Sequence, residues 1–445
     1  MREVTFQALI DEGVLRIGDG YRAKLEELGG TGYPFLRSEF VDERHIAFDN
    51  AESFHAELEP KLKAKLSCPG DTVITTKGNS TGRAAYVRPE LRTFVYSPHL
   101  SFWRSLNDEV LHPGFLREWA HSPEFTDQLN GMKDSTDMAP YLSLTDQRRL
   151  RITVPEPDEQ RAIARVLGAL DDKIELNRRM NRTLEELSEA LFRAWFVDFE
   201  PVVAKAAGRA PFGLAPSVAA LFPAAFTGSE LGPIPQGWRV RPLAEIADIN
   251  GRTIRKDYQH AEIEYVDISA VSEGQLGETT LHPRASAPSR AQRLVAHGDT
   301  IWSCVRPNRR SFLFIANPPA NLVVSTGFAA ISPRCPSAAF IYAATTTDEF
   351  TDYLVAHAEG SAYPAVRPDT FAKAPLVVPS DDVVAAFDKI VGPWLAQAAH
   401  NVRESRTLAA LRDTLLPKLL SGELRVRDAV KLAEAPALAS AGMRS

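Results

Sequence analysis

Apolar side chains recur through the middle of the chain at alternating steps of four and three residues. The positions that follow this spacing are Ile163, Leu167, Leu170, Ile174, Asn177, Asn181, Leu184, Ser188, Leu191 and Trp195. A 4-3 spacing is typical of a helix that packs through one seam against a partner helix in a coiled coil. We expect this helix to begin near Asp158, because Asp is an acceptable N-cap residue.

A second helix with the same seam is predicted near the end of the chain. Its seam positions are Phe387, Val391, Trp394, Ala398, Asn401, Ser405, Leu408, Arg412, Leu415 and Leu419. Asn177 and Asn401 are equivalent in the two seams, and a buried Asn costs stability but fixes the register of a coiled coil. We therefore expect the two helices to pair with each other, antiparallel; two ordinary core helices are the alternative. Pro393 and Pro417 should kink or end the second helix, because proline lacks an amide hydrogen.

The two helices belong to an internal repeat of the whole chain. Residues 154–191 align with residues 378–415 without a gap, at a shift of 224 residues. The segments before the helices repeat more weakly: GDTVITTKGNSTGRAAYV (residues 70–87) parallels GDTIWSCVRPNRRSFLFI (residues 298–315). The chain is therefore predicted to be two copies of one unit, in which a globular domain precedes a long helix.

The globular parts carry the pattern of short strands. Runs such as RLRITVP, EYVDIS and SFLFIA are rich in β-branched and aromatic residues and are bounded by turn residues. Helical stretches over residues 114–129 and 337–358 intervene, so each domain is predicted to be α+β with a mostly antiparallel sheet. The expected segments are a first domain (1–157), a first helix (158–200), an Ala-, Pro- and Gly-rich linker (201–234), a second domain (235–380), a second helix (381–426) and a flexible tail (427–445).

Composition limits the class of protein. The chain is 44% hydrophobic and 24% charged, as is usual for a globular protein, and its three cysteines, Cys68, Cys304 and Cys335, form no CxxC pair. The sequence contains no run of about 18 apolar residues and no signal-peptide pattern at its start, so we expect a cytoplasmic protein without a membrane partner. The net charge of −6 argues against nucleic acid only for the chain as a whole, because local clusters decide binding.

Three apparent catalytic motifs are weak. NPPA (residues 317–320) lacks the aromatic residue that amino-methyltransferases place after NPP, and GNSTGR (residues 78–83) lacks the GK[ST] ending that grips phosphates. Asp158, Asp171 and Lys173 match loosely the two carboxylates and lysine of a nuclease, but they fall on one predicted helix, so we expect residues 171–173 to form a solvated helix face. We predict a chain without catalytic residues, a metal site or a cofactor of its own; a self-sufficient DNA methyltransferase or nuclease is the alternative.

Basic residues cluster at equivalent places in the two repeats. Lys61–Arg92 has a net charge of +5, from seven Lys or Arg against two acidic residues, and Arg284–Arg310 has +5, from six against one. Lys neutralises phosphates, and Arg and Asn bond to guanine and adenine edges, so these loops are predicted to contact DNA. The candidate residues are Lys77, Asn79, Thr81, Arg83, Arg92, Arg284, Arg293, Arg306, Asn308, Arg309 and Arg310. A coiled-coil scaffold with two inert domains is a further alternative.

Three segments resemble a known family. Residues 154–202 (VPEPDEQRAIARVLGALDDKIELNRRMNRTLEELSEALFRAWFVDFEPV), 229–238 (SELGPIPQGW) and 411–426 (LRDTLLPKLLSGELRV) resemble the specificity subunit of type I restriction-modification enzymes. The resemblance covers nearly the whole chain and is weaker in the globular domains. It implies that each domain is a target-recognition domain for one half of a bipartite, asymmetric double-stranded DNA site.

The resemblance also implies partners. In this family the helices are spacers that dock methyltransferase subunits, expected in two copies, while restriction and translocase subunits complete the complex. S-adenosylmethionine, ATP and Mg²⁺ are then expected on those partners. Asp158, Glu159, Gln160, Asn177 and Asn401 are the candidate spacer and docking residues. The second copy, VVPSDDVVAAF, lacks a counterpart of the Glu159–Gln160 pair.

Overall fold

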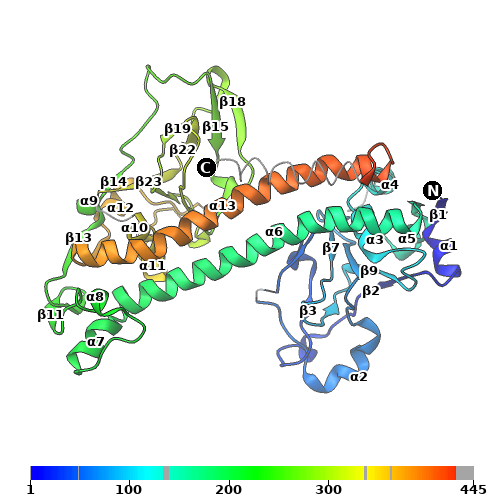
Figure 1. The fold of residues 1–445 in the computed structure, drawn as a ribbon, viewed down its shortest axis with the longest axis horizontal. Helices are drawn as coiled ribbons and strands as arrows, with labels where there is room; N and C mark the ends of the chain where they lie inside the picture. The colour runs from blue at the N-terminus through cyan, green and yellow to red at the C-terminus, as the bar shows by residue number, and fades with distance from the viewer. Residues whose placement is uncertain (1, 49, 134–139, 335–337, 361–362, 427–445) are drawn as a thin grey trace. The chain divides into compact units, whose positions relative to one another are not determined.

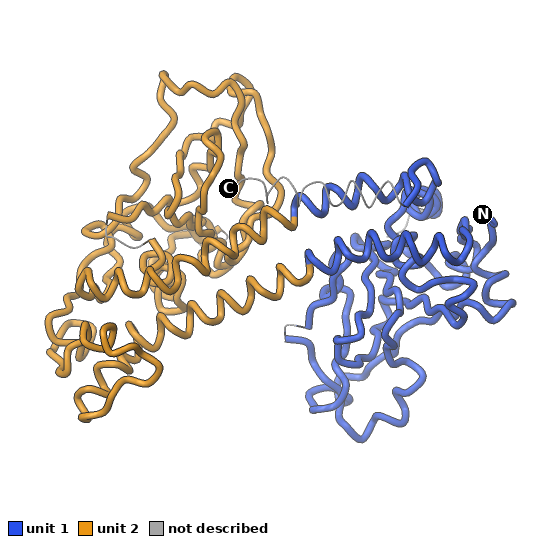
Figure 2. Tube along the Cα trace, in the orientation of Figure 1, with its two compact units in different colours: residues 1–174, 406–445 blue, residues 175–405 orange. Residues whose placement is uncertain are grey.

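The structure, a computed structural model, describes residues 2–48, 50–133, 140–334, 338–360 and 363–426. The expected flexible tail (427–445) and Cys335 lie outside these residues. The chain forms two compact units: residues 1–174 with 406–445, and residues 175–405 (Figure 2). Each unit contains one globular domain and a segment of both long helices.

The first domain is built around an antiparallel sheet with the order β2-β9-β6-β7 (Figure 1). Its strands are β1 (Arg2–Thr5), β2 (Leu15–Asp19), β3 (Phe35–Leu36), β4 (Val41–Asp42), β5 (His45–Ile46), β6 (Thr72–Thr75), β7 (Ala84–Tyr86), β8 (Val95–Tyr96), β9 (Leu100–Ser105) and β10 (Arg151–Val154). Its helices are α1 (Phe6–Asp11), α2 (Glu59–Leu62), α3 (Pro113–Trp119), α4 (Pro123–Lys133) and α5 (Leu144–Arg149). Strand β6 is buried at every position, so it forms the centre of the core.

The second domain repeats this sheet with the order β14-β23-β20-β21 and adds a second sheet, β18-β15-β22-β19. Its strands are β13 (Arg239–Pro242), β14 (Ala247–Ile249), β15 (Glu262–Val266), β16 (Val271–Ser272), β17 (Gln275–Leu276), β18 (Thr280–Pro283), β19 (Ala291–Leu294), β20 (Thr300–Ser303), β21 (Phe312–Phe314), β22 (Leu322–Ser325), β23 (Phe328–Pro333) and β24 (Pro375–Val378). Its helices are α9 (Leu243–Ile246), α10 (Ala338–Thr345), α11 (Asp348–Ala356) and α12 (Pro368–Lys373). The expected α+β class, repeated twice, is confirmed.

Each of the two predicted helical stretches is a pair of helices rather than one. Within residues 114–129, α3 ends before Ser122, whose hydroxyl accepts the amide hydrogen of Phe125 at 3.1 Å. Between α10 and α11, Thr347 caps the second helix by accepting from the Phe350 amide at 3.1 Å. Ser and Thr hydroxyls satisfy the orphan amides of a helix start, so each marks a new helix.

The repeat extends to individual hydrogen bonds. In the first domain the Cys68 amide donates to the buried Asp71 carboxylate at 2.8 Å, and in the second the Ala296 amide donates to Asp299 at 2.8 Å. Both carboxylates also form an ion pair with an arginine, Asp71 with Arg104 and Asp299 with Arg252. A buried carboxylate is stable only when it is paired and hydrogen-bonded. Both copies meet this requirement with arginines from different elements, Arg104 from β9 and Arg252 from the loop after β14.

The two long helices are α6 (Pro157–Phe192), which continues into a π-helical turn (Arg193–Val197), and α13 (Asp381–Leu420). Helix α6 begins one residue before the expected Asp158, with proline in its first turn, where the missing amide hydrogen costs nothing. Of the two expected effects of Pro393 and Pro417, a kink or an end of the second helix, the end is wrong, because α13 runs through both prolines.

The seam pairs the helices antiparallel within each unit. In the first unit Leu167 and Leu170 of α6 share a core with Leu415 and Leu419 of α13. In the second unit the side-chain amide of Asn401 donates to the side-chain oxygen of Asn181 at 2.8 Å. The side-chain amide of Asn177 donates to the backbone carbonyl of Asn401 at 3.4 Å. Both Asn177 and Asn401 are buried, so the predicted seam asparagines and their pairing are confirmed.

The linker (201–234) contains regular secondary structure. It contains α7 (Glu200–Ala206), α8 (Pro216–Ala219) and a hairpin of β11 (Phe226–Ser229) and β12 (Gly232–Pro235). The Phe222 ring packs edge-on against Trp195 of the first long helix, which ties the linker to the core of the second unit. Among the described helices, none combines the length and the apolarity needed to cross a membrane.

Candidate nucleic-acid interface

Each domain brings two loops together through the same backbone hydrogen bonds. In the first domain the Gly78 amide donates to the Pro140 carbonyl at 3.1 Å, and the Leu142 amide donates to the Thr76 carbonyl at 2.9 Å. In the second domain Arg306 donates to Pro364 at 2.7 Å and Val366 donates to Cys304 at 2.8 Å. We call these the paired loops: residues 76–83 with 140–143, and residues 304–311 with 363–366.

The first of the paired loops turns at two left-handed positions in each domain. Gly78 and Gly82 have φ angles of 83° and 97°, and the equivalent residues of the second domain, Arg306 and Arg310, both have φ of 52°. Glycine adopts this conformation freely, whereas a residue with a Cβ is strained by roughly 1–2 kcal/mol. The second domain therefore holds two arginines where the backbone favours glycine.

Three of the candidates in the first domain point their side chains into solvent. Lys77, Asn79 and Arg83 are exposed, and Arg83 lies 3.7 Å from the Asp42 carboxylate. Thr81 is buried, and its hydroxyl donates to the Gly78 carbonyl at 2.7 Å. Thr81 therefore holds the loop in shape and does not face a ligand.

Arg92 lies outside the paired loops. Its guanidinium sits 5.1 Å from the centre of the Phe48 ring, and its side chain is exposed. The structure thus separates Arg92 from Lys77 and Asn79, although all three fall in one basic stretch of sequence.

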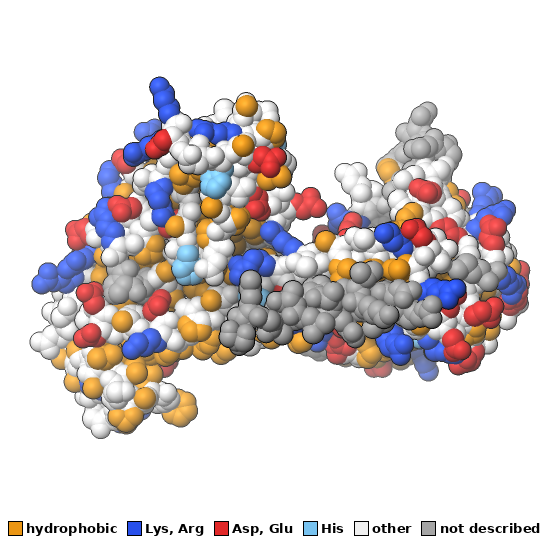
Figure 3. Space-filling model, turned by 45° about the horizontal axis from the view of Figure 1, so that its top comes forward, with side chains coloured by type: hydrophobic (Ala, Val, Ile, Leu, Met, Phe, Trp, Pro, Cys, Tyr) orange, Lys and Arg blue, Asp and Glu red, His pale blue; other side chains and the backbone are white. Residues whose placement is uncertain are grey.

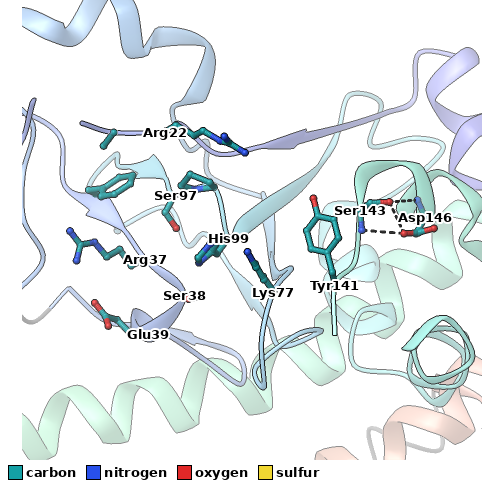
Figure 4. A pocket seen from close by; sticks show the side chains of 13 residues that line it. Arg22, Arg37, Ser38, Glu39, Lys77, Ser97, His99, Tyr141, Ser143 and Asp146 are labelled. Carbon is teal, nitrogen blue, oxygen red and sulfur yellow. Dashed lines mark hydrogen bonds between the residues drawn. The ribbon is translucent and has the colours of Figure 1, made fainter. Parts of the chain in front are cut away.

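The paired loops of the first domain border a hollow of about 1100 Å³ (Figure 4). The side chains around it include Arg22, Arg37, Lys77, His99 and Tyr141. They come from the segments after β2 and β3, from the loops after β6 and β8, and, for Tyr141, from the segment before α5. Such a basic, open surface suits an extended anionic ligand better than a compact one.

Sequence reasoning missed Arg22, Arg37 and His99, because they are spread over residues 22–99 and only the fold brings them together. Two acidic residues also line the hollow. They are Glu39 and Asp146. The Asp146 carboxylate accepts a hydrogen bond from the Ser143 hydroxyl at 2.5 Å, at the start of α5.

The candidates of the second domain fall into two groups. Asn308 and Arg309 are exposed on the paired loops, and the Arg306 guanidinium lies 4.7 Å from the centre of the Tyr363 ring. Arg310 instead forms ion pairs with Glu273 and Asp348 and donates to the Thr346 carbonyl at 2.9 Å. Arg310 therefore anchors the loop to α11 and the β16–β17 turn, and its donors are used within the domain.

Arg284 and Arg293 support a different loop, residues 251–260. Arg284 donates to the carbonyl oxygens of Arg255 (3.0 Å) and Tyr258, and its guanidinium covers the Tyr258 ring. Arg293 is half-buried, and this burial lowers the pKa of its guanidinium. Arg284 is therefore a structural residue, whereas Arg293 supports the loop through its backbone, which bridges Thr253.

The loop that they support carries exposed cations of its own. Arg255 and Lys256 are exposed, and Arg255, Tyr258 and His260 line a hollow of about 430 Å³. This loop follows β14 as the segment with Arg22 follows β2, at the same place in the repeated sheet. The basic residues of this loop stand together in the sequence GRTIRKDYQH (residues 251–260). Sequence reasoning missed them because this segment lies outside the aligned repeat segments. Figure 3 shows Lys and Arg side chains, interspersed with acidic ones, over the second domain.

The candidate docking residues at the start of α6 have unequal roles. Gln160 is 1% exposed; its side-chain oxygen accepts from the His112 amide at 2.8 Å, and its nitrogen donates to the carbonyls of Val110 (3.0 Å) and Pro155 (2.9 Å). Gln160 thus fastens α6 to the loop before α3 and is closed to a partner. Asp158 is exposed and pairs with Arg161 at 2.7 Å, and Glu159 is half-buried.

The expected solvated face at residues 171–173 is wrong for Asp171, whose side chain is 6% exposed. Its two carboxylate oxygens accept from Arg44 at 2.8 Å and from Arg412 at 2.7 Å, and Arg44 also bonds to the buried Glu118. Burial alone would raise the pKa of Asp171, but the surrounding guanidinium groups hold that pKa below its ordinary value. Asp172, its neighbour, is exposed as expected and pairs with Arg88.

Comparisons with known proteins agree on one family. Residues 12–186 match the model of the type I restriction modification DNA specificity domain. The chain is 24% identical over 426 residues to the type I restriction enzyme HindI specificity subunit of Haemophilus influenzae, covering 85% of this chain and 91% of that protein. It is 21% identical over 430 residues to the MjaIX specificity subunit of Methanocaldococcus jannaschii, covering 94% and 93%.

A solved structure agrees at the level of the fold. The S subunit of the type I restriction-modification system from M. genitalium superposes with a TM-score of 0.56 at 14% identity, over 94% of this chain and 95% of that one. The sequence resemblance is thereby confirmed: residues 12–186 match the model of the type I restriction modification DNA specificity domain, and the chain is similar over most of its length to the specificity subunits of type I restriction enzymes.

Proposed function

We propose that this chain is the DNA sequence-specificity subunit of a type I restriction-modification complex, and that each domain contacts one half of a bipartite, asymmetric site. The observation that carries the proposal is the paired loops, which both domains build with the same backbone hydrogen bonds and furnish with exposed Asn, Lys or Arg side chains. Asn bonds well to adenine and Arg to guanine, whereas Lys and Arg neutralise phosphates.

The acidic net charge is compatible with this function. The exposed cations Lys77 and Arg309 lie on the paired loops, and Arg22 and Arg255 lie on the loops after β2 and β14. Acidic charge elsewhere limits binding to unrelated DNA, because nonspecific affinity scales with the number of phosphates neutralised.

Methyl transfer, translocation and cleavage are assigned to partner subunits, which would bind S-adenosylmethionine, ATP and Mg²⁺. The nuclease-like Asp171 supports this assignment, since both of its carboxylate oxygens are bonded to arginines. A carboxylate engaged in this way is a poor metal ligand. The methyltransferase subunits are proposed to be present in two copies and to dock on the long helices.

The long helices are proposed to set the gap between the two half-sites. Both helices contribute residues to both units, and α6 alone has 36 residues, which is about 54 Å at 1.5 Å per residue. Asn177 and Asn401 fix the register of the seam, so the length of the paired segment is defined.

The test is the methylation pattern of cells that carry this chain with its methyltransferase partner. Sequencing that detects modified bases should report one bipartite motif, and the chain or the partner alone should give none. The purified chain, incubated with DNA and labelled S-adenosylmethionine or with Mg²⁺, should neither methylate nor cleave. Methyl transfer by the chain alone would make it an enzyme, and a partner that methylates the same motif without the chain would make the chain a scaffold.

A further inference from the structure

Each pair of loops carries one tyrosine whose side chain is mostly in solvent. Tyr141 is 60% exposed and Tyr363 is 70% exposed. A single exposed aromatic residue needs no explanation, because much of any protein surface is apolar. An exposed tyrosine on the same loop in both copies of a diverged repeat is a stronger observation.

The two tyrosines are not one inherited position. The backbone hydrogen bonds align Tyr141 with Ala365 in the second domain, and they align Pro140 with Pro364. Tyr363 therefore precedes the position that corresponds to Tyr141. Each copy has placed an aromatic ring on this loop at its own residue.

The backbone at or next to both rings is hydrogen-bonded to the other loop. Tyr141 forms an isolated bridge with Lys77, and its neighbours Pro140 and Leu142 are bonded to the other loop. In the second domain, the residue after Tyr363 accepts from the Arg306 amide at 2.7 Å. A ring held on a fixed backbone loses little conformational freedom on binding, which is what makes Tyr effective in contact surfaces.

A basic side chain lies beside each ring. Lys77 and Tyr141 form a backbone bridge and line the same hollow (Figure 4), and the Arg306 guanidinium covers the Tyr363 ring at 4.7 Å. Arg306 does so from a left-handed backbone in which its counterpart is Gly78. A strained residue that keeps a long cationic side chain indicates that the side chain is used.

We infer that Tyr141 and Tyr363 are DNA-contact residues, whose rings pack against base edges or deoxyribose in a groove while Lys77 and Arg306 pair with nearby phosphates. The inference rests on the proposed function. It adds one residue per half-site whose contribution to DNA affinity does not depend on the salt concentration. The apolar ring face does this, as in contacts with a thymine methyl group, and the hydroxyl is not required.

The experiment measures the affinity of the assembled complex of this chain and its methyltransferase partner for a duplex with the methylated motif, over a range of salt concentrations. Tyr141→Ala and Tyr363→Ala should each weaken binding by about tenfold or more without changing the salt dependence, since no charge is lost. Tyr141→Phe and Tyr363→Phe should bind within about twofold of the parent. Lys77→Ala should lower the slope of log affinity against log salt by about 0.9.

The matched control is Phe212→Ala, which removes a fully exposed aromatic ring in the linker and should leave DNA affinity unchanged. Base substitutions in the duplex should show that each tyrosine affects one half-site only. Wild-type affinity in both Ala variants would overturn the inference, as would a loss of affinity that accompanies a lower thermal unfolding midpoint. Failure of the proposed function is distinct: the unaltered complex would then show no preference for any duplex.

Discussion

Arg306 occupies the backbone position that Gly78 holds in the other domain, and both residues are left-handed. The two domains thus have the same loop shape, but the backbone is relaxed at Gly78 and strained at Arg306. A substitution at Arg306 is therefore expected to affect the stability of the second domain and its affinity for DNA in different directions.

Replacing Arg306 by Gly should weaken DNA binding without destabilising the second domain. Relief of the left-handed strain, roughly 1–2 kcal/mol, offsets the lost contact with Tyr363, about 0.5–1 kcal/mol. The thermal unfolding midpoint should therefore stay level or rise, while the affinity of the assembled complex falls and its salt slope drops by about 0.9. A lower midpoint would show that Arg306 is a structural residue.

Gly78→Ala provides the converse variant. A Cβ at Gly78 would meet open space, so only the left-handed backbone opposes it. We expect a loss of about 1 kcal/mol in the free energy of unfolding of the first domain, with DNA contacts by Lys77 retained. Denaturant unfolding measures the loss, and Gly131→Ala, which lies in α4 and also meets open space, should not share it.

The buried ion pair at Asp171 should make the first unit sensitive to acid. Because the folded-state pKa is below the unfolded value, the stabilisation is fully present above about pH 5 and is lost as pH falls through the folded pKa. Asp171→Asn should lower the free energy of unfolding by about 3–5 kcal/mol at pH 7, since it leaves buried guanidinium groups with less compensation. This loss in the free energy of unfolding should become smaller below about pH 4. The control is Asp172→Asn, at an exposed site, which should cost less than about 0.5 kcal/mol at any pH.

Glu185 should give the second unit the opposite dependence on pH. Burial, followed by the nearby Glu273, raises the pKa of Glu185 to about 7. Since the folded state binds the proton more tightly, this contribution is fully present below the unfolded pKa of about 4.3 and is lost as pH rises through 7. The thermal unfolding midpoint of the second unit should therefore decrease as the pH rises from about 6 to about 8, and Glu185→Gln should remove much of that decrease. The exposed Glu186→Gln should not.

Periodicity explains what the sequence could predict. The 4-3 seam, the equivalence of Asn177 and Asn401, and the repeat all follow from local spacing, and the structure has each of them. Neither Pro393 nor Pro417 ends α13, because packing outweighs one lost hydrogen bond. The carbonyl left without an amide partner four residues before Pro393 belongs to Lys389, which is exposed to water.

Contacts between residues far apart in the chain explain what the sequence could not predict. Asp171 looks like a solvated helix residue until Arg44 and Arg412, 127 and 241 residues away, are brought beside it. Arg310 looks as free as Arg309 until Glu273 and Asp348 are seen to bind it. Charge clusters in sequence thus mark the right loops, and only the fold separates the residues that support a loop from those that face outward.

The spacer role of the helices can be tested by shortening both by one heptad. Deleting residues 173–179 from α6 and 402–408 from α13 keeps the 4-3 seam, the bond between Asn181 and Asn401 and the ion pair between Asp171 and Arg412. Seven residues correspond to about 10 Å of helix, or about three base pairs of B-DNA at 3.4 Å each. The methylated motif should keep both half-site sequences and lose about three base pairs from its gap.

Deleting residues 173–179 alone is the matched control, because it leaves α13 seven residues too long for its partner and displaces Asn181 from Asn401. This variant should lose folding or partner docking, whereas the double deletion should keep both. Three base pairs also rotate one half-site by about 100° around the duplex, at roughly 10 base pairs per turn, so the double deletion should methylate more slowly than the parent. A double-deletion complex that still methylates the original motif, with its gap unchanged, would show that the helices do not set the spacing.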